Sequence, residues 1–412
     1  MISVEKALKI ILANSQLLAL EKVNILDARA RVIGEDIFAT RNIPSADNSA
    51  MDGYAVRYAE TKGVSKTRPL QLQVIEEIPA GKIPQKKLKK GEASRIMTGA
   101  IIPLGADAVV RQEDTQRIGK VVEIYAAVEK GRDIRFSGED VKKGELVISR
   151  GSIIGPAHIG MLASLGRTFA CVYKKPRVAI MATGNELVDI KSDPRPGKIV
   201  NSNSYALAAQ VLECGGIPLV MSITKDKKTD LRKKFKAALN TDLIISSGGV
   251  SVGDYDLVKD VMAEMGNTMR FWQVAMRPGK PLAFGAIQGV SLFGLPGNPV
   301  STMVSFEQFV RPYLLKIQGH KKIFRQTIKA LSAQKIEKQA GVKHFIRAII
   351  KKEKNQYIAT ITGSQGSGIL KSMVTANALI VLKDNENKIN KGDPVTVQLL
   401  DDSLSNAKSF QL

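Results

Sequence analysis

The spacing of hydrophobic residues changes several times along the chain, and each change predicts a different kind of element. Behind Ser3, which can cap a helix, apolar residues recur from Val4 to Leu12 at the spacing of an amphipathic helix. Over Arg177–Gly319, short apolar runs of strand type alternate with helical patterns. Such alternation is typical of a mostly parallel sheet covered by helices. We therefore expect an α/β domain with a doubly wound sheet over residues 173–321.

Two further regions show the period-two alternation of β-strands. Residues 43–135 include the alternating run Leu70–Val74 and are divided by turn-forming stretches, which predicts a β-rich inserted domain. Residues 322–412 are basic and alternating, which predicts a separate small β domain. We expect this C-terminal domain to form a small β-barrel. The segments that flank the insertion, 1–42 and 136–172, are expected to form one helical or mixed N-terminal domain.

One stretch, Leu243–Asp256, organises the expected α/β domain. It begins with an apolar run of the kind found in strands buried on both faces. Gly248 and Gly249 then permit a sharp turn, and Asp254 and Asp256 precede the next helical pattern. A strand, a glycine-rich turn and a helix start together present backbone N–H groups to an anion such as a phosphate. The two carboxylates could hold a hard cation against that phosphate.

Four loops with polar residues follow strand-like runs in this domain. They are Gly184–Glu186, the loop with Asp226, Gly248–Asp256 and Pro296–Ser301. Because ligands of such sheets bind at the carboxyl ends of the strands, we expect these loops to converge. Their carboxylates would repel one another unless a cation joined them, which supports a divalent metal with a phosphorylated ligand. Arg277 and Lys280 would supply anion-binding charge.

A serine hydrolase is a competing interpretation of the same stretch. Gly249–Gly253 fits the G-x-S-x-G pattern, with Ser251 as the nucleophile, and this needs a histidine later in the chain. Only His320 and His344 follow, and the lysines beside His320 would disfavour its protonated form. The phosphate and metal hypothesis is therefore preferred. A glycine-rich crossover with solvated aspartates remains a structural alternative.

Structural interpretations also remain open for three other positions. Asp52 and Thr98 each precede a glycine, a common arrangement in turns. The polar glycine-rich segment Gly363–Gly368 is equally explained as a hairpin loop. None of these positions identifies a function by itself.

Composition narrows the class of protein. The chain has 412 residues and 44% hydrophobic content, which is ordinary for a globular protein of several domains. No apolar run approaches the ~20 residues that cross a membrane, and the N-terminus lacks the apolar core of a signal peptide. Cys171 and Cys214 are isolated, so neither a disulfide framework nor a thiolate metal site is indicated. We expect a cytoplasmic protein without membrane contact.

The formal net charge of +22 raises the question of nucleic acid. The basic residues are scattered in lysine-rich clusters, and aromatic residues do not interleave with them as stacking platforms would. A solvated lysine surface is the preferred interpretation, and no nucleic-acid partner is expected. The same charge could still attract anionic substrates.

Nine motifs in order give the chain a family resemblance. It resembles the molybdopterin molybdenumtransferase family, which is related to the enzymatic domain of gephyrin, over essentially its whole length. The motifs are Asp47–Val56, Arg95–Ala100, Gly105–Val110, Ser137–Asp140, Thr183–Leu187, Ser246–Asp256, Arg277–Pro281, Leu295–Ser301 and Gly363–Gly368. One such motif would be weak, whereas nine in order are very specific.

The resemblance implies a fold, a reaction and partners. It implies four domains per subunit and an elongated homodimer, with transient contact to molybdopterin adenylyltransferase as a further possible interaction. The implied reaction takes adenylylated molybdopterin and molybdate and yields molybdenum cofactor and AMP, with a divalent metal, normally Mg²⁺. Arg277 stands where some members have lysine, and Asn185 stands where others have aspartate, so Asn185 is left out of the metal set.

Together, the resemblance and the residue patterns predict three groups of site residues. The predicted catalytic residues are Asp52, Thr98, Glu186, Asp256, Arg277 and Lys280. The predicted ligand-binding residues are Gly248, Gly249, Ser251, Gly297, Asn298, Pro299, Arg347 and Ser367. The predicted metal ligands are Glu186, Asp226 and Asp256. An adenylyltransferase-like enzyme, which would resemble only Arg177–Gly319, and a non-enzymatic scaffold or nucleic-acid binder are the alternatives.

Overall fold

Two compact units make up the chain, and each is described by itself. The computed structural model describes residues 1–193, 195–224, 227–248 and 257–401. Unit 1 contains Met1–Lys22, Ala30–Gly34 and the described part of Cys171–Leu412, and unit 2 contains Val23–Arg29 and Glu35–Ala170. The division between the units falls within strands β1 (Leu20–Asn24) and β12 (Phe169–Tyr173).

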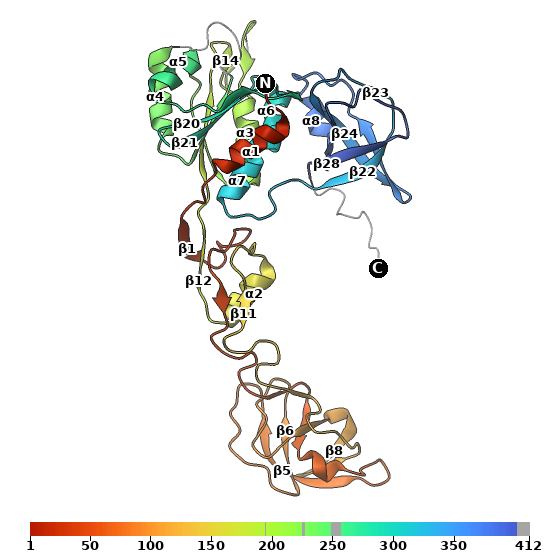
Figure 1. Ribbon diagram of the computed structural model, residues 1–412. Coiled ribbons are helices and arrows are strands. Elements are labelled where there is room, and N and C mark those ends of the chain that lie inside the picture. Colours follow the sequence, from red (N-terminus) through yellow and green to blue (C-terminus); the bar gives the residue numbers. More distant parts are fainter. Residues whose placement is uncertain (194, 225–226, 249–256, 402–412) are drawn as a thin grey trace. The chain divides into compact units, whose positions relative to one another are not determined.

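A six-stranded sheet forms the centre of unit 1 (Figure 1). In spatial order its strands are β16 (Ile217–Val220), β13 (Arg177–Ala182), β17 (Leu243–Ser247), β21 (Val290–Leu295), β20 (Pro281–Ile287) and β18 (Phe271–Gln273). The first four run parallel, whereas β20 and β18 are antiparallel to their neighbours. The sheet is therefore mostly parallel, as the alternating pattern predicts.

Side chains that alternate along the strands feed two hydrophobic cores, one on each face. Val178 and Ile180 pack with helices α1 (Val4–Ala13), α3 (Asn203–Glu213), α6 (Pro299–Ser305) and α7 (Arg311–Ile317). Ala179 and Met181 pack on the other face with α4 (Lys228–Ala238) and α5 (Leu257–Glu264). Figure 1 shows α4 and α5 together on one side of the sheet. Helices thus cover both faces.

The predicted N-terminal helix is confirmed as α1. The side chain of Ser3 accepts a hydrogen bond from the Lys6 amide at 3.1 Å, which satisfies one of the free N–H groups at the helix start. Val4, Ala7 and Ile11 are buried against the α/β core. This helix therefore belongs to unit 1.

A second six-stranded sheet in unit 1 is closed into a ring. Its order is β19 (Met276–Arg277), β24 (Lys343–Glu353), β25 (Gln356–Ile361), β22 (Thr327–Ser332), β28 (Pro394–Leu399) and β26 (Ala378–Leu382). Strand β24 pairs with both β25 and β26, which closes the last five strands on themselves. The predicted C-terminal barrel is confirmed, because alternate side chains of these strands fill one enclosed core.

Unit 2 is built mainly of β-strands, as predicted for residues 43–135. Its six-stranded sheet has the order β7 (Ala108–Arg111), β4 (Gly53–Val56), β6 (Glu92–Ile96), β5 (Leu70–Ile78), β9 (Val121–Ile124) and β8 (Thr115–Ile118). Two short ladders pair β10 (Ile134–Arg135) with β3 (Asn48–Ser49), and β11 (Leu146–Ile148) with β2 (Ile37–Phe38). Helix α2 (Pro156–Ser164) begins at Pro156, a residue type favoured at the first position of a helix.

Short elements complete the two units. Unit 1 also has β14 (Leu187–Val188), β15 (Ile199–Val200), β23 (Ile336–Glu337), β27 (Lys388–Ile389), helix α8 (Lys371–Thr375) and the π-helical turn η3 (Phe306–Val310). Unit 2 also has the 3₁₀ turns η1 (Tyr58–Thr61) and η2 (Gln112–Asp114). The boundaries of the predicted four domains stay a prediction.

A buried ion cluster lies on η3, between α6 and α7. Glu307 is only 5% exposed and accepts two hydrogen bonds from Arg325, at 3.0 Å from Nε and 3.2 Å from Nη2. The Nε of Arg311 lies 4.0 Å from the same carboxylate. The more exposed Glu213 also pairs with Arg325, at 2.6 Å, so Glu307 is the buried carboxylate of the cluster.

Loss of this charge should destabilise unit 1. We expect Glu307→Gln to lower the free energy of unfolding by about 3 kcal/mol, because both arginines lose their buried partner. Glu337→Gln is the control, since Glu337 pairs with Lys335 at an exposed position and should lose less than about 1 kcal/mol. Urea denaturation of the two variants measures the difference, and equal losses would contradict this account.

Candidate active site

The parallel strands of unit 1 end at one level, which brings their loops together. The backbone register pairs Ala182 with Ser247 and Ser247 with Leu295, and Thr183 bridges Thr224 on the neighbouring strand. The loops that begin after β13, β17, β21 and Thr224 therefore start side by side. This edge is the candidate active site in unit 1.

Glu186 lies on the loop that follows β13, and its side chain is exposed. Gly184 has φ of +148°, and a Cβ added there would lie 2.4 Å from a carboxylate oxygen of Glu186. Only glycine therefore allows the carboxylate to lie over this part of the backbone. Gly248, after β17, also has positive φ. The other predicted residues of these loops, Asp226, Gly249, Ser251 and Asp256, lie outside the described residues.

The loop that follows β21 contacts the barrel domain. Asn298 donates a hydrogen bond from Nδ2 to Oγ of Ser367 at 3.0 Å, and the Val300 amide donates to the Ser367 carbonyl at 3.0 Å. Pro299 is the first residue of α6. Two of the predicted ligand-binding residues, distant in sequence, are therefore in direct contact.

Arg277 and Lys280 lie on a tight loop whose cationic side chains are exposed. The Val274 amide donates to the Lys280 carbonyl at 3.0 Å, which closes the loop. Gly279 has φ of +104°, and a Cβ there would lie 2.5 Å from Oγ of Ser305 on α6. Glycine thus lets the loop pack against α6 while both cations face solvent.

Arg347 is buried, unlike the other predicted basic residues. Its side chain is 1% exposed and donates from Nε to Ser372 Oγ at 3.1 Å and from Nη2 to the Gly366 carbonyl at 2.9 Å. Burial lowers the pKa of this guanidinium. Arg347 therefore holds the loop that carries Ser367, and direct contact with a ligand stays a prediction.

Asp52 and Thr98 are in direct contact in unit 2. Oδ1 of Asp52 accepts hydrogen bonds from the Thr98 amide at 2.7 Å and from the Thr98 hydroxyl at 2.8 Å. These bonds, the backbone one first, lower the pKa of Asp52. Both side chains are exposed, so the pair presents an ionised carboxylate to solvent.

Sequence reasoning missed Asn203, the first residue of α3. Its Nδ2 donates to Ser247 Oγ at 2.9 Å and to the Gly297 carbonyl at 2.7 Å. One side chain thus ties the end of β17 to the loop after β21. The available signal was the polar run Asn201–Ser204 directly before a helical pattern, which is also an ordinary helix start.

His344 lies opposite Arg277 in the β19–β24 ladder. Its side chain is buried, and Nε2 has no hydrogen-bond partner in the structure as described. Burial, followed by the positive charges of Lys338 and Arg277, lowers the pKa of His344 from 6.5 to about 4. The imidazole is therefore neutral beside the exposed Arg277.

The low pKa of His344 predicts a pH effect on stability. Because the folded protein disfavours protonation, the stabilisation is complete above pH ~6.5 and is lost as the pH falls toward the folded pKa of about 4. The loss reaches at most about 3 kcal/mol. Melting temperatures of the wild type and His344→Gln, compared at pH 7.5 and 4.5, measure it. The melting temperature should fall more for the wild type than for the variant between pH 7.5 and pH 4.5. Equal falls would refute the low pKa assigned to His344.

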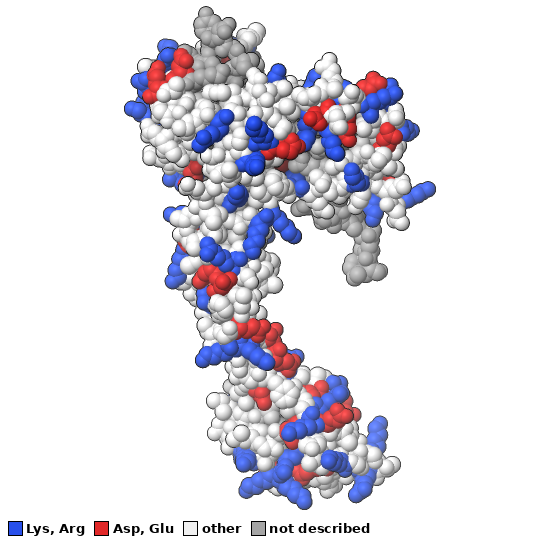
Figure 2. All heavy atoms as spheres, in the orientation of Figure 1, with Lys and Arg blue, Asp and Glu red and all other residues white. Residues whose placement is uncertain are grey.

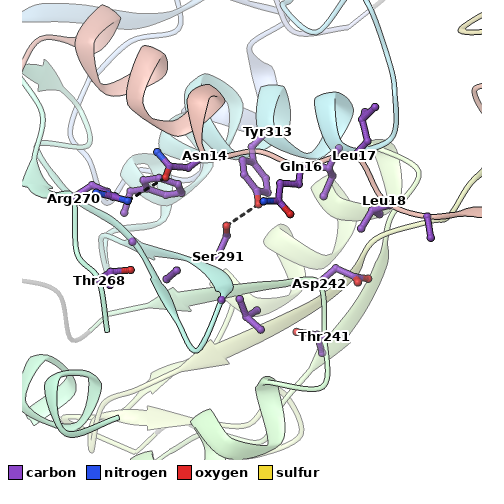
Figure 3. A pocket seen from close by; sticks show the side chains of 17 residues that line it. Asn14, Gln16, Leu17, Leu18, Thr241, Asp242, Thr268, Arg270, Ser291 and Tyr313 are labelled. Atoms are coloured by element: carbon purple, nitrogen blue, oxygen red, sulfur yellow. Dashed lines mark hydrogen bonds between the residues drawn. The ribbon is translucent and has the colours of Figure 1, made fainter. Parts of the chain in front are cut away.

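A polar cavity of about 490 Å³ lies at the opposite edge of the α/β sheet (Figure 3). Thr241 and Asp242, which precede β17, line it together with Ser291 at the start of β21. The Tyr313 hydroxyl is hydrogen-bonded to Ser291 Oγ at 2.7 Å in its wall. None of the predicted site residues lines this cavity.

Charged side chains are distributed over the visible surface of both units. Figure 2 shows lysine and arginine interspersed with aspartate and glutamate on each unit. Among the helices of the described residues, none has the length and apolar character needed to cross a membrane.

Three family models match successive parts of the chain. They are the MoeA N-terminal region (domains I and II) at residues 2–166, a probable molybdopterin-binding domain at 179–316 and the MoeA C-terminal region (domain IV) at 329–400. These matches define a MoeA-type protein whose α/β sheet lies in the part matched by a probable molybdopterin-binding domain.

Similar proteins cover nearly the whole chain. Molybdopterin molybdenumtransferase of a Nostoc species is 38% identical over 92% of this chain and 88% of its own. The Haemophilus influenzae protein of the same name is 36% identical over 92% and 93%. A crystal structure of a molybdopterin biosynthesis MoeA protein from Pyrococcus horikosii is 32% identical, with a TM-score of 0.86 over 97% and 99%. The chain belongs to the molybdopterin molybdenumtransferase family.

Proposed function

We propose that this protein transfers molybdenum from molybdate to adenylylated molybdopterin in the cytoplasm, releasing AMP and molybdenum cofactor. One observation carries the proposal: in a chain of this family, residues predicted for the site lie together at one edge of the sheet. Gly248 directly follows β17 there, and Asn298 contacts Ser367 of the barrel domain. Relatives that align over nine-tenths of the chain bear the name of this transferase.

Binding of the two substrates requires fixed donors and positive charge. Molybdate is a dianion, and the exposed cations Arg277 and Lys280 provide charge and hydrogen-bond donors for it. Ser367 adds a hydroxyl donor. Arg347 holds the loop that carries Ser367 through its hydrogen bond to the Gly366 carbonyl. Gly297, Asn298 and Pro299 would bind the pterin ligand.

The residues also suit a Mg²⁺ ion. In the described part of the chain no cation pairs with the Glu186 carboxylate, so its oxygens remain available to a hard cation. Asp226 and Asp256 would complete the ligand set. When bound, the ion would withdraw charge from the phosphate oxygens as the link to AMP is cleaved. Glu186 itself holds the ion and helps to orient the phosphate.

The alternative functions leave part of the chain unused. An adenylyltransferase-like enzyme would need only the α/β domain, whereas unit 2 supplies the Asp52–Thr98 pair and the barrel supplies Ser367. A scaffold or nucleic-acid binder needs no such polar constellation. Transient contact with molybdopterin adenylyltransferase would deliver the adenylylated substrate directly.

The reaction can be tested by AMP release. Purified protein incubated with adenylylated molybdopterin, molybdate and Mg²⁺ should release AMP. Asp256→Ala should abolish release and leave the pterin ligand bound at least as tightly, because a like charge near the phosphate is removed. Asp260→Asn is the control, since Asp260 pairs with Lys228 on the surface and should leave turnover unchanged. Unchanged turnover in Asp256→Ala would sink the assignment.

We further propose a homodimer whose two active sites each use both chains. Asp52 and Thr98 belong to unit 2, whereas Glu186 belongs to unit 1 together with the Arg277 loop. The family resemblance implies that unit 2 of one subunit serves the pterin-binding domain of the other. A two-fold dimer then contains two equivalent composite sites.

Mixed dimers test the shared site. Asp52→Ala and Asp256→Ala should each be inactive alone. When refolded together, about half of the dimers are mixed, and each mixed dimer has one intact site. AMP release should therefore recover to roughly a quarter of wild type per subunit. Mixing Asp226→Ala with Asp256→Ala should recover nothing. An inactive Asp52 and Asp256 mixture, with mixed dimers demonstrated, would place the site in one chain.

A further inference from the structure

Two buried threonine hydroxyls at the carboxyl edge have no partner. Thr183 is 4% exposed and Thr224 is 1% exposed, and Oγ1 of neither makes a hydrogen bond in the structure as described. The two residues are bridge partners on adjacent strands. Buried hydroxyls are nearly always hydrogen-bonded, so a pair of unpaired ones at a candidate site calls for a bonding partner from outside the chain.

The backbone donors around these threonines are already used. The amides of Thr183 and Gly184 donate to the carbonyls of Ser247 and Thr224 at 3.3 and 3.4 Å. The amide of Thr224 donates to the Ala182 carbonyl at 2.9 Å. In many phosphate-binding turns such amides hold the anion. Here the amides bond to carbonyls of neighbouring segments. Among these donors, the two threonine hydroxyls are therefore the ones that remain available to a ligand.

Gly248 lies close to Thr183. A Cβ added to Gly248 would lie 2.9 Å from the Thr183 carbonyl oxygen and 3.6 Å from Thr183 Oγ1. A side chain at residue 248 would therefore press on Thr183. Asn185, two residues beyond Thr183, is exposed, so the hydroxyls lie just inside the edge.

The loop that follows Thr183 carries charges of both signs, the Glu186 carboxylate and the Lys198 ammonium group. Lys198 is bound through Nζ to the Asn185 carbonyl at 2.7 Å, which places a positive charge on the same loop. Two adjacent hydroxyls can each donate one hydrogen bond to neighbouring oxygens of a tetrahedral anion. We propose that Thr183 and Thr224 donate hydrogen bonds to the phosphate group of the pterin ligand; this inference rests on the proposed function.

Isosteric variants separate ligand binding from stability. Thr183→Val and Thr224→Val remove an unpaired hydroxyl, so the melting temperature should equal or exceed that of wild type. The dissociation constant for molybdopterin, measured without divalent metal, should rise about tenfold for each variant. Thr183→Ser should retain wild-type affinity. Dephosphorylated molybdopterin should bind wild type and both valine variants equally.

A paired threonine in unit 2 provides the control. Thr61 is fully buried, and its hydroxyl donates to the Tyr58 carbonyl at 2.8 Å and accepts from the Val128 amide at 3.1 Å. Thr61→Val should therefore lower the melting temperature and leave molybdopterin affinity unchanged.

The outcomes distinguish this inference from the proposed function. Valine variants that bind molybdopterin within twofold of wild type would overturn the inference and leave the function intact. The inference would also be overturned if the valine variants bound dephosphorylated molybdopterin as much more weakly as they bind molybdopterin, or if Thr183→Ser weakened binding as much as Thr183→Val. In either case altered packing, and not a lost hydrogen bond to the phosphate, would explain the weaker binding. Wild-type protein that binds no molybdopterin and releases no AMP would overturn the proposed function itself.

Discussion

The backbone register of three parallel strands is the constraint on which the candidate site depends. Ser247 is paired with Ala182 on one side and Leu295 on the other, so three strands end at the same level. Hydrogen bonds of the sheet fix this alignment, and a slip of one residue would send the strand side chains to the wrong core. The two cores, one on each face, therefore hold the loops at the edge in place.

The barrel domain contributes to that edge through a few specific contacts. Strand β19, which ends at Arg277, pairs with β24 of the barrel, and Ser367 is bonded to the loop before α6. Phe345 and Leu379 of the barrel pack into the same core as α1 and the α/β sheet. The loop that carries Ser367 is thus fixed from two directions, by α6 and by the buried Arg347.

Local patterns were sufficient to predict much of the fold. The helix from Val4, the strand pattern of Arg177–Gly319 and the strands of the C-terminal domain follow from periodicity, because burial on one or both faces dictates where apolar residues fall. The packing of α1 against the α/β sheet could not be predicted, since its apolar face indicates burial but names no partner. Candidate site residues could be proposed where motifs carry glycines and charged residues, as at Gly184 and Arg277, and their roles stay a prediction. Asn203 and the buried position of Arg347 depend on contacts between distant segments, which no local pattern encodes.

Closure of the C-terminal ring also affects the tendency of the protein to aggregate. An open sheet ends in a strand whose unpaired amides and carbonyls can recruit another chain. In the ring, β26 is paired with both β28 and β24, so its apolar run Ala378–Leu382 offers no free backbone edge. This segment combines high β-propensity with no charge, the composition most prone to form intermolecular sheets. Ring closure therefore protects against aggregation as well as holding the loop with Ser367.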